Sequence, residues 1–515
     1  MLQSLRFLCF SSRNSEPLDS TKNAHDIPRL RSIRRASYYA RVPRQVLEKT
    51  LSRENSVSRP THTTPTTTPT AVPTDTTSTC ASSFLSDAQS HITASSATSE
   101  NASSSTEALG KLPATMPSLD SGTPYLSIMQ TDGTLRPPPI TFDGYGRFGG
   151  RFAPESLIDF LNNLTSFFEA TVSDPSFWSE YATYQRAEPT PLQIASKLTS
   201  WAGGATIWLK REDQNEYGSH KTRNILGQLL LARRMGFTEI VTDCAAAKHG
   251  NFTAAMCARL GLRCVVVMGA ADALAQGEDV LEMKMLGAKV LTARAPSGMG
   301  SLRAAITEAL RYSVCNYEST YYLMGGPVGP SPLPTLTRTF QALLGEEVAV
   351  QMRAAAGCQP DAVVTAVGSG TGAVGMFRPF LQSAKIRLVA VEAAGAAALT
   401  DGDLGVLHGA RTLMLQNWDG QILDSNSISP DLNLSTVGPE VAHWKECGRV
   451  EIKAATDTDA LDGFKTMRYH EGILPGLDSS HAVGGAIDLA KELGPGKNLV
   501  LLVTGCDAIG LGLDV

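Results

Sequence analysis

The stretch Gly218-Ser219-His220-Lys221-Thr222-Arg223-Asn224 decides the fold. It follows an apolar run at 205–209 that is typical of a buried strand, and it precedes 225–234, where apolar residues have helical spacing. Lys221 is therefore predicted at the start of a helix, beside a turn. A lysine in that position is usually a solvated first-turn residue, so a chemical role for it needs support from the rest of the chain.

Short β-branched apolar runs alternate with helical patterns after this stretch. The runs lie at 239–241, 264–268, 289–291, 362–367, 387–391 and 499–503. Buried strands separated by helices form βαβ units and parallel sheets. The fold class is therefore predicted to be α/β with mostly parallel sheets.

Residues 1–137 have a different composition from the remainder. Their Thr/Pro/Ser tract at 58–105 is poor in large apolar residues, so burial would not offset the entropy of ordering it. We predict a disordered Ser/Thr/Pro-rich extension over 1–137 and a catalytic α/β region over 138–515.

The overall composition excludes some classes of function. The 515 residues carry a net charge of -5, which argues against general nucleic-acid binding, and no apolar run is long enough to span a membrane. Nine cysteines without a CxxC motif indicate reduced thiols, and we expect no metal centre. We expect a cytoplasmic protein. Mitochondrial targeting is the alternative, because the first 13 residues contain Arg and Ser but no acid.

A glycine-rich loop, Gly368-Ser369-Gly370-Thr371-Gly372, directly follows a predicted strand. Glycines allow backbone N–H groups to surround an anion, and the hydroxyls add donors. It is not a P-loop, because no Gly-Lys-Ser/Thr follows. The loop favours a phosphate site, although a tight turn between two elements is the alternative.

A lysine at a helix start together with a phosphate site suggests pyridoxal phosphate, because this cofactor needs an amine for its aldehyde and donors for its phosphate. Thr504, at the end of the last predicted strand, offers the ring nitrogen a neutral hydroxyl. A neutral partner does not hold a proton on that nitrogen. This favours β-elimination and β-replacement over transamination.

From about residue 142 to 505, the sequence resembles the tryptophan synthase β subunit family of fold-type-II pyridoxal phosphate enzymes. The matching segments are 146–155, 188–192, 209–213, 220–221, 249–250, 285–288, 391–395, 407–409, 437–439 and 470–475. The resemblance implies two three-layer α/β domains with the active site between them.

The resemblance also implies roles for individual residues. Lys221 would carry the cofactor and shuttle the substrate α-proton, and Gly368 to Gly372 would bind the phosphate with help from His220. Glu471 would lie near the cofactor ring, and Thr504 would contact the ring nitrogen. The family reaction removes the hydroxyl of L-serine and adds indole at the β-carbon.

The chain departs from the family pattern where the substrate would bind. The family's active-site glutamate falls on Asp243, which is one methylene shorter. The loop for the substrate carboxylate reads Ala245-Ala246-Ala247-Lys248-His249; alanines keep the N–H donors but restrict positive φ. Lys248 would add a charged contact to a carboxylate, a solvent-facing lysine being the alternative.

Two further departures occur together. The family's substrate-facing aspartate aligns with Asn433, and its arginine partner aligns with Cys506. Losing one member of a buried ion pair would cost about 3–5 kcal/mol, whereas losing both avoids that penalty. The paired change therefore favours a changed substrate specificity.

We expect a homodimer that acts without an α subunit, because the family's α-contact motif reads Leu274-Ala275-Gln276 and a later arginine aligns with Glu282. The predicted function is β-replacement, joining L-serine or a similar amino acid to indole or an indole-like nucleophile. The alternatives are an enzyme with a different amino acid or nucleophile, a β-eliminase that releases pyruvate and ammonia, and a catalytically weak cofactor-binding regulator.

Overall fold

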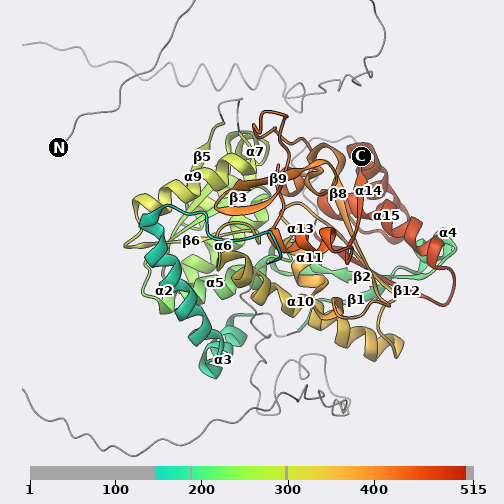
Figure 1. Cartoon of the computed structure of the whole chain (residues 1–515). Helices are drawn as coiled ribbons and strands as arrows, with labels where there is room; N and C mark the ends of the chain where they lie inside the picture. The colour runs from blue at the N-terminus through green and yellow to red at the C-terminus, as the bar shows by residue number, and fades with distance from the viewer. Residues whose placement is uncertain (1–144, 186–187, 296–297, 299, 506–515) are drawn as a thin grey trace, which may run out of the picture. The chain divides into compact units, whose positions relative to one another are not determined.

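The computed structural model describes residues 145–185, 188–295, 298 and 300–505 (Figure 1). These residues belong to one compact unit, Ala102–Val515. The predicted extension at 1–137 and Cys506 lie outside the described residues. Within the described part, no helix is long and apolar enough to cross a membrane.

A six-stranded sheet combines strands from both ends of the catalytic region. Its strands, in spatial order, are β1 (Leu192–Ile194), β2 (Thr206–Arg211), β12 (Asn498–Val503), β7 (Ala362–Ala366), β8 (Arg387–Ala393) and β11 (Glu451–Ala455). β1 is antiparallel to β2, and the other pairs are parallel. The predictions for β2, β7, β8 and β12 are confirmed.

A four-stranded parallel sheet is formed by β5 (Lys289–Ala293), β4 (Arg263–Gly269), β3 (Glu239–Cys244) and β6 (Thr320–Leu323). β3 is central and pairs with β4 and β6. A separate antiparallel pair consists of β9 (Asp403–Leu407) and β10 (Ala410–Met414). The predicted α/β class with mostly parallel sheets is confirmed.

Helices pack on both large sheets. Figure 1 shows α6 and α9 beside β3, and α15 beside β8. The helices are α2 (Glu155–Val172), α3 (Pro175–Tyr184), α4 (Ser196–Ala202), α5 (Thr222–Arg234), α6 (Ala247–Leu260), α7 (Ala270–Ala275), α8 (Gly277–Met285), α9 (Leu302–Cys315), α10 (Leu333–Ala356), α11 (Thr371–Met376), α12 (Ala398–Asp401), α13 (Pro439–Glu446), α14 (Asp457–Glu471) and α15 (Leu477–Leu493).

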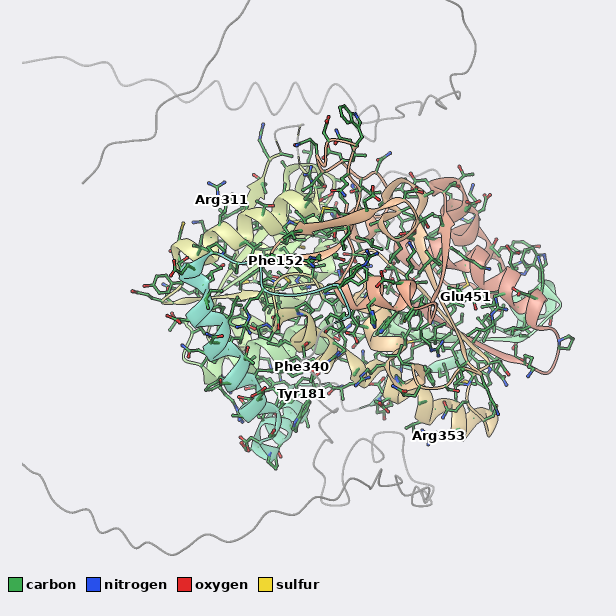
Figure 2. The ribbon with its side chains drawn as sticks, in the orientation of Figure 1. Phe152, Tyr181, Arg311, Phe340, Arg353 and Glu451 are labelled. Atoms are coloured by element: carbon green, nitrogen blue, oxygen red, sulfur yellow. The ribbon has the colours of Figure 1, made fainter. Side chains whose placement is uncertain are left out.

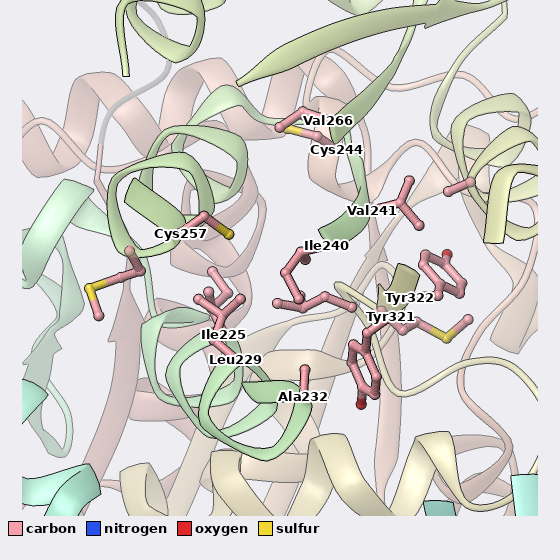
Figure 3. Close-up of a cluster of buried hydrophobic side chains, with 14 of the residues drawn as sticks. Ile225, Leu229, Ala232, Ile240, Val241, Cys244, Cys257, Val266, Tyr321 and Tyr322 are labelled. Atoms are coloured by element: carbon pink, nitrogen blue, oxygen red, sulfur yellow. The ribbon is translucent and has the colours of Figure 1, made fainter. Parts of the chain in front are cut away.

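Helix α5, which follows Lys221, is buried at every position from Thr222 to Ala232. Its apolar side chains form one cluster with those of β3 and β6, including Ile225, Leu229 and Ile240 (Figure 3). Polar residues of α5, such as Arg223 and Gln228, are buried as well as the apolar ones, so the helix has neighbours on every side. The start of α5 is therefore fixed by packing along the helix.

The contact between α5 and α10 is unusually close at Gly227. A Cβ added there would lie 2.3 Å from the ring of Phe340. The ring of Phe340 also stacks on Tyr181 of α3, with centroids 6.2 Å apart (Figure 2). Tyr181 in turn donates a hydrogen bond to the carbonyl of Arg223, at 3.1 Å. Three helices thus converge on the first turn of α5.

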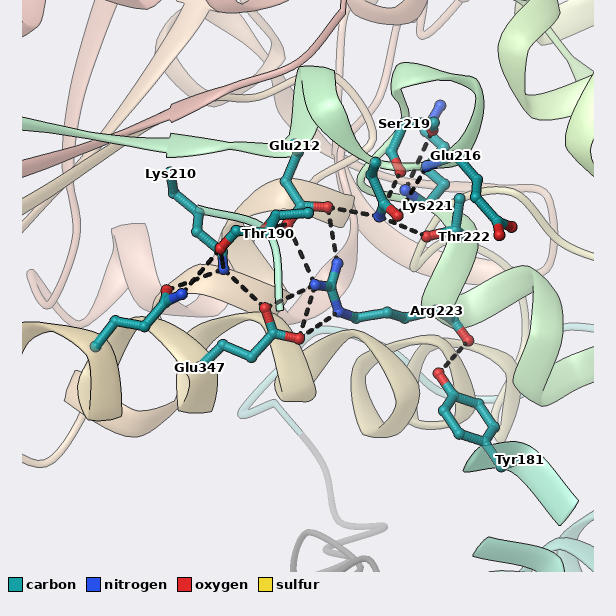
Figure 4. A network of polar contacts seen from close by, with 12 residues as sticks. Tyr181, Thr190, Lys210, Glu212, Glu216, Ser219, Lys221, Thr222, Arg223 and Glu347 are labelled. Atoms are coloured by element: carbon teal, nitrogen blue, oxygen red, sulfur yellow. Dashed lines mark hydrogen bonds and ion pairs between the residues drawn. The ribbon is translucent and has the colours of Figure 1, made fainter. Parts of the chain in front are cut away.

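Four buried charged side chains form a network close to Lys221 (Figure 4). Lys210 contacts Glu347 at 2.7 Å, and Arg223 contacts both Glu347 and Glu212 at 2.8 Å. The two cations and two anions balance. Burial acts to raise the pKa of Glu212, but Arg223 and Lys210 outweigh burial and bring its pKa to about 2.

Replacing Glu347 with Gln should destabilise the protein, because Lys210 and Arg223 would lose their shared carboxylate inside the protein. We expect the free energy of unfolding to fall by about 3–5 kcal/mol. Urea denaturation measures this change. The control is Glu308→Gln, which removes an exposed ion pair with Arg311 and should change stability by less than about 1 kcal/mol. Equal effects of the two variants would contradict the prediction.

Candidate active site

Lys221 occupies the N-cap position of α5, directly after a turn that contacts the end of β12. Gly218 in that turn has φ 63°, and a Cβ added to it would lie 3.2 Å from Cα of Gly505. The Gly505 N–H donates to the Gly218 carbonyl at 2.8 Å. A glycine is needed at 218 both for its backbone conformation and for this close approach.

A cavity with about 370 Å³ of unfilled space, part of it open to solvent, lies at this junction. It brings together the start of α5, the loop after β7, the start of α15 and the end of β12. Its lining residues are His220, Lys221, Thr365, Ala366, Gly368, Ser369, Gly370, Thr371, Gly372, Asp431, Leu432, Asp478, Ser479, Leu502 and Thr504.

The glycine loop passes close to neighbouring backbone. A Cβ on Gly368 would lie 2.2 Å from the carbonyl oxygen of Asp431, and Gly370 has φ 104°. The hydroxyls of Ser369 and Thr371 are 3.1 Å apart at the start of α11. The first N–H groups of a helix have no partners within that helix. Backbone N–H groups and two hydroxyls are thus available to a phosphate.

His220 also lines the cavity, and its Nε2 is buried without a hydrogen-bond partner among the described residues. Burial and the charge of Lys221 lower its pKa. A buried polar atom normally has a partner. An imidazole nitrogen beside the glycine loop therefore fits the phosphate role predicted for His220.

Lys221 forms an ion pair that the sequence did not predict. Its Nζ lies 2.7 Å from Oδ1 of Asp431, and the two side chains are 12% and 18% exposed. Burial acts to lower the pKa of Lys221, but Asp431 outweighs burial and raises it. Conversely, burial acts to raise the pKa of Asp431, and Lys221 outweighs burial and lowers it.

Thr504 lies at the end of β12, where its hydroxyl contacts the side chains of Asp478 and Ser479. Glu471 lies elsewhere: it is the last residue of α14, and its carboxylate accepts a hydrogen bond from the Leu198 N–H at 2.7 Å. Glu471, which the resemblance led us to expect near the cofactor ring, is therefore not among the residues that line the cavity. The chain turns between α14 and α15, and the carboxylate that this part of the chain contributes to the cavity is that of Asp478, in the run Asp478-Ser479-Ser480-His481.

Asp243 is held at the end of β3. Its carboxylate accepts hydrogen bonds from the Tyr322 hydroxyl at 2.8 Å and from the Gly325 N–H at 3.2 Å. Burial raises the pKa of Asp243. His249 lies close by, since a Cβ on Gly325 would be 3.2 Å from both Asp243 and His249. Burial and then the charge of Lys221 lower the pKa of His249 to about 3, so its imidazole is neutral at pH 7.

The loop Ala245-Ala246-Ala247, called the alanine loop below, is buried. Some of its backbone hydrogen-bonding groups already have partners within the protein. The Ala247 N–H donates to the side chain of Gln276 at 2.8 Å, and that side chain donates back to the Ala245 carbonyl. The expected carboxylate site therefore has fewer available donors than the residue pattern predicts. Ala246, also buried, precedes α6. Nζ of Lys248 lies close to Gly505, just after β12. A Cβ built on Gly505 would be 3.1 Å from this Nζ.

Asn433 follows a 3₁₀ turn, η7 (Pro430–Leu432). Its N–H donates to the Pro430 carbonyl at 3.2 Å, and its side-chain oxygen is buried without a partner in the described structure. Asp431 and Leu432 line the cavity, whereas Asn433 is not among the lining residues. The carboxylate in this segment is thus two residues earlier than the position that the family alignment indicates.

Comparison with known proteins agrees with this geometry. Residues 184–505 match the family model described as "Pyridoxal-phosphate dependent enzyme". Three similar curated proteins are a "Tryptophan synthase" of Saccharomyces cerevisiae, a "Tryptophan synthase beta chain" of Allorhizobium ampelinum and another of Jannaschia sp. They are 45%, 43% and 42% identical over 71%, 72% and 70% of this chain, and the matches cover 53%, 94% and 91% of those proteins.

The fold and the cavity thus define a pyridoxal phosphate-dependent lyase. Within this class, the chain belongs to the tryptophan synthase β family. It spans about half the length of the yeast relative and most of the length of the two bacterial ones. Lys221 is the amine that would hold the cofactor's aldehyde, and Gly368 to Gly372 would hold its phosphate.

Replacing Gly368 with Ala should weaken cofactor binding, because the new Cβ would overlap the Asp431 carbonyl and displace the loop. We expect the dissociation constant for pyridoxal phosphate to rise about tenfold or more, which equals about 1.4 kcal/mol. Absorbance titration of the cofactor measures it. Gly484→Ala is the matched control, since a Cβ there meets nothing within 4 Å. An unchanged affinity in Gly368→Ala would show that the loop does not hold the phosphate.

Proposed function

We propose that this protein catalyses β-replacement, joining L-serine or a similar amino acid to indole or an indole-like nucleophile to give L-tryptophan or a relative. One observation carries the proposal: the amine of Lys221, the glycine loop and the Thr504 hydroxyl line one cavity. The relatives named tryptophan synthase support the same reaction. Bound pyridoxal phosphate would supply the electron withdrawal that makes the substrate α-proton acidic.

Lys221 and Asp243 would divide the proton transfers. Nζ of Lys221 takes the proton from the substrate α-carbon as general base. Asp243 protonates the departing hydroxyl, a role that suits a carboxyl group whose pKa is raised by burial. Thr504 would offer a neutral hydroxyl to the cofactor's ring nitrogen. Tyr322 and Gly325 hold Asp243 in place, which restricts where its shorter arm delivers the proton.

Product analysis tests the reaction directly. Purified protein is mixed with L-serine, threonine or cysteine, with and without indole, and products are identified by mass spectrometry. We expect an indole adduct such as tryptophan from L-serine, and no product from Lys221→Ala, which lacks the amine. Pyruvate and ammonia alone would favour the β-eliminase instead. Absence of any cofactor absorbance in the wild-type protein would contradict the enzyme assignment.

Asp243→Asn should slow product formation about 100-fold or more, because an amide cannot donate the proton to the leaving hydroxyl. The cofactor absorbance should remain, since the amide keeps the size of the side chain. Steady-state rates with L-serine and indole measure the effect. The control is Asp361→Asn, which removes a carboxylate that pairs with Lys497. Unchanged turnover in Asp243→Asn would remove Asp243 from the mechanism.

The proposals on oligomeric state, α-subunit partner and cellular location rest on the sequence. We propose a homodimer that acts without an α subunit and is cytoplasmic, with mitochondria as the alternative location. In support, two of the altered contact positions differ in exposure: Leu274 is 44% exposed, whereas the side chain of Gln276 is buried against the alanine loop. Gln276 therefore supports the active-site loop and is not available to another chain.

A further inference from the structure

We propose that Asp431 is a positioning residue that stabilises the protonated amine of Lys221 once this amine has taken the proton from the substrate. This inference rests on the proposed use of Lys221 as the proton carrier and extends it to a second residue. Asp431 would thereby decide whether the proton taken from the substrate is retained in the site.

The position of Asp431 is fixed by its backbone. It is the middle residue of η7, and its carbonyl oxygen lies so close to Gly368 that a Cβ there would be 2.2 Å away. From this position the carboxylate reaches Nζ of Lys221 at 2.7 Å, where both side chains are largely buried. Hydrogen bonds between ionised groups are shorter and about twice as strong as neutral ones. Asp431 is thus held by the same loop that would hold the phosphate.

The other titratable groups around this pair do not replace Asp431. They come from the turn before α5 and from β3, α6, α7 and α15, and they are His220, Asp243, Cys244, His249, Asp272 and Asp478. Burial raises the pKa of Asp243, and burial together with the charge of Asp431 raises the pKa of Asp272 to about 8. The pKa of Asp431 is lowered instead. At pH 7 the carboxyl group of Asp272 is therefore largely protonated, whereas that of Asp431 is ionised.

The consequence for the reaction concerns one proton. When the amino group of the substrate replaces Lys221, Nζ becomes a free amine. It takes the proton from the α-carbon, and the electron pair of the broken C–H bond stays on the substrate. Nζ is then an ammonium group 2.7 Å from a carboxylate. The ion pair stabilises this ammonium, so the proton remains available for return to the substrate at the end of the cycle.

Competitive acetylation measures the protonation of Lys221 directly. The full-length chain, freed of cofactor, is exposed to trace acetic anhydride between pH 7 and 12, and acetylation of each lysine is quantified by mass spectrometry. Only an unprotonated amine reacts. In Asp431→Asn, we expect the midpoint for Lys221 to fall by about 1–3 pH units relative to the wild type, the usual effect of an opposite charge at this distance. An unchanged midpoint would overturn the inference.

Three variants serve as controls. Asp431→Glu keeps the negative charge, so the acetylation midpoint of Lys221 should stay close to that of the wild type. Asp361→Asn breaks the Lys497 pair, where the atoms are 3.0 Å apart and more exposed; it should leave the midpoint for Lys221 unchanged. If Asp431→Asn does not fold, Asp431→Ser removes the same charge with a smaller side chain and carries the same expectation.

The labelling experiment separates this inference from the proposed reaction, because it uses neither substrate nor turnover. A shifted midpoint without an indole adduct in the product analysis would contradict the reaction and support the role of Asp431. An indole adduct together with an unshifted midpoint would support the reaction and contradict the role of Asp431. A purely structural role for Asp431 would change stability without moving the midpoint, so that outcome also counts against the inference.

Discussion

The buried charge network of Lys210, Glu212, Arg223 and Glu347 is the interaction on which the active site depends. Lys210 belongs to β2 of the six-stranded sheet, Arg223 to α5, which packs with the four-stranded sheet, and Glu347 to α10. Each charge has an opposite charge within 2.8 Å. Because an unpaired charge would be costly inside the protein, the network fixes the start of α5 relative to β2. Lys221 is two residues from Arg223, so its location follows from this arrangement.

Much of the architecture could be predicted from the sequence, because buried parallel strands are apolar runs with clear boundaries. Five strands of the described structure were missed: β1, β6, β9, β10 and β11. Two of them show why: β6 (Thr320–Leu323) contains two tyrosines, and β11 (Glu451–Ala455) carries Glu451 and Lys453 at an edge of its sheet. The convergence of Lys221, the glycine loop and Thr504 was also predictable, since such residues follow or precede strands whose ends meet at one sheet edge.

The carboxylates of the site were harder to predict. Glu471 and Asp478 lie on either side of the short connection between α14 and α15, and Asn433 and Asp431 are separated by one residue. Sequence position alone therefore does not indicate which side chain reaches the cavity. The backbone path decides: α14 ends at Glu471, and η7 passes against Gly368. These two local geometries give the cavity Asp478 and Asp431. The resulting site carries more negative charge around the lysine than the residue pattern indicates.

The contact between Gly218 and Gly505 has a consequence for sequence variation in the family. A Cβ on Gly505 would lie 3.1 Å from Cα of Gly218, and a Cβ on Gly218 would lie 3.2 Å from Cα of Gly505. Neither position accepts a larger residue unless the other segment moves, although 286 residues separate them along the chain (505 minus 218, less one). The two positions are therefore under a joint constraint: they should remain glycine together or change together, and an insertion near either one should be accompanied by an adjustment near the other.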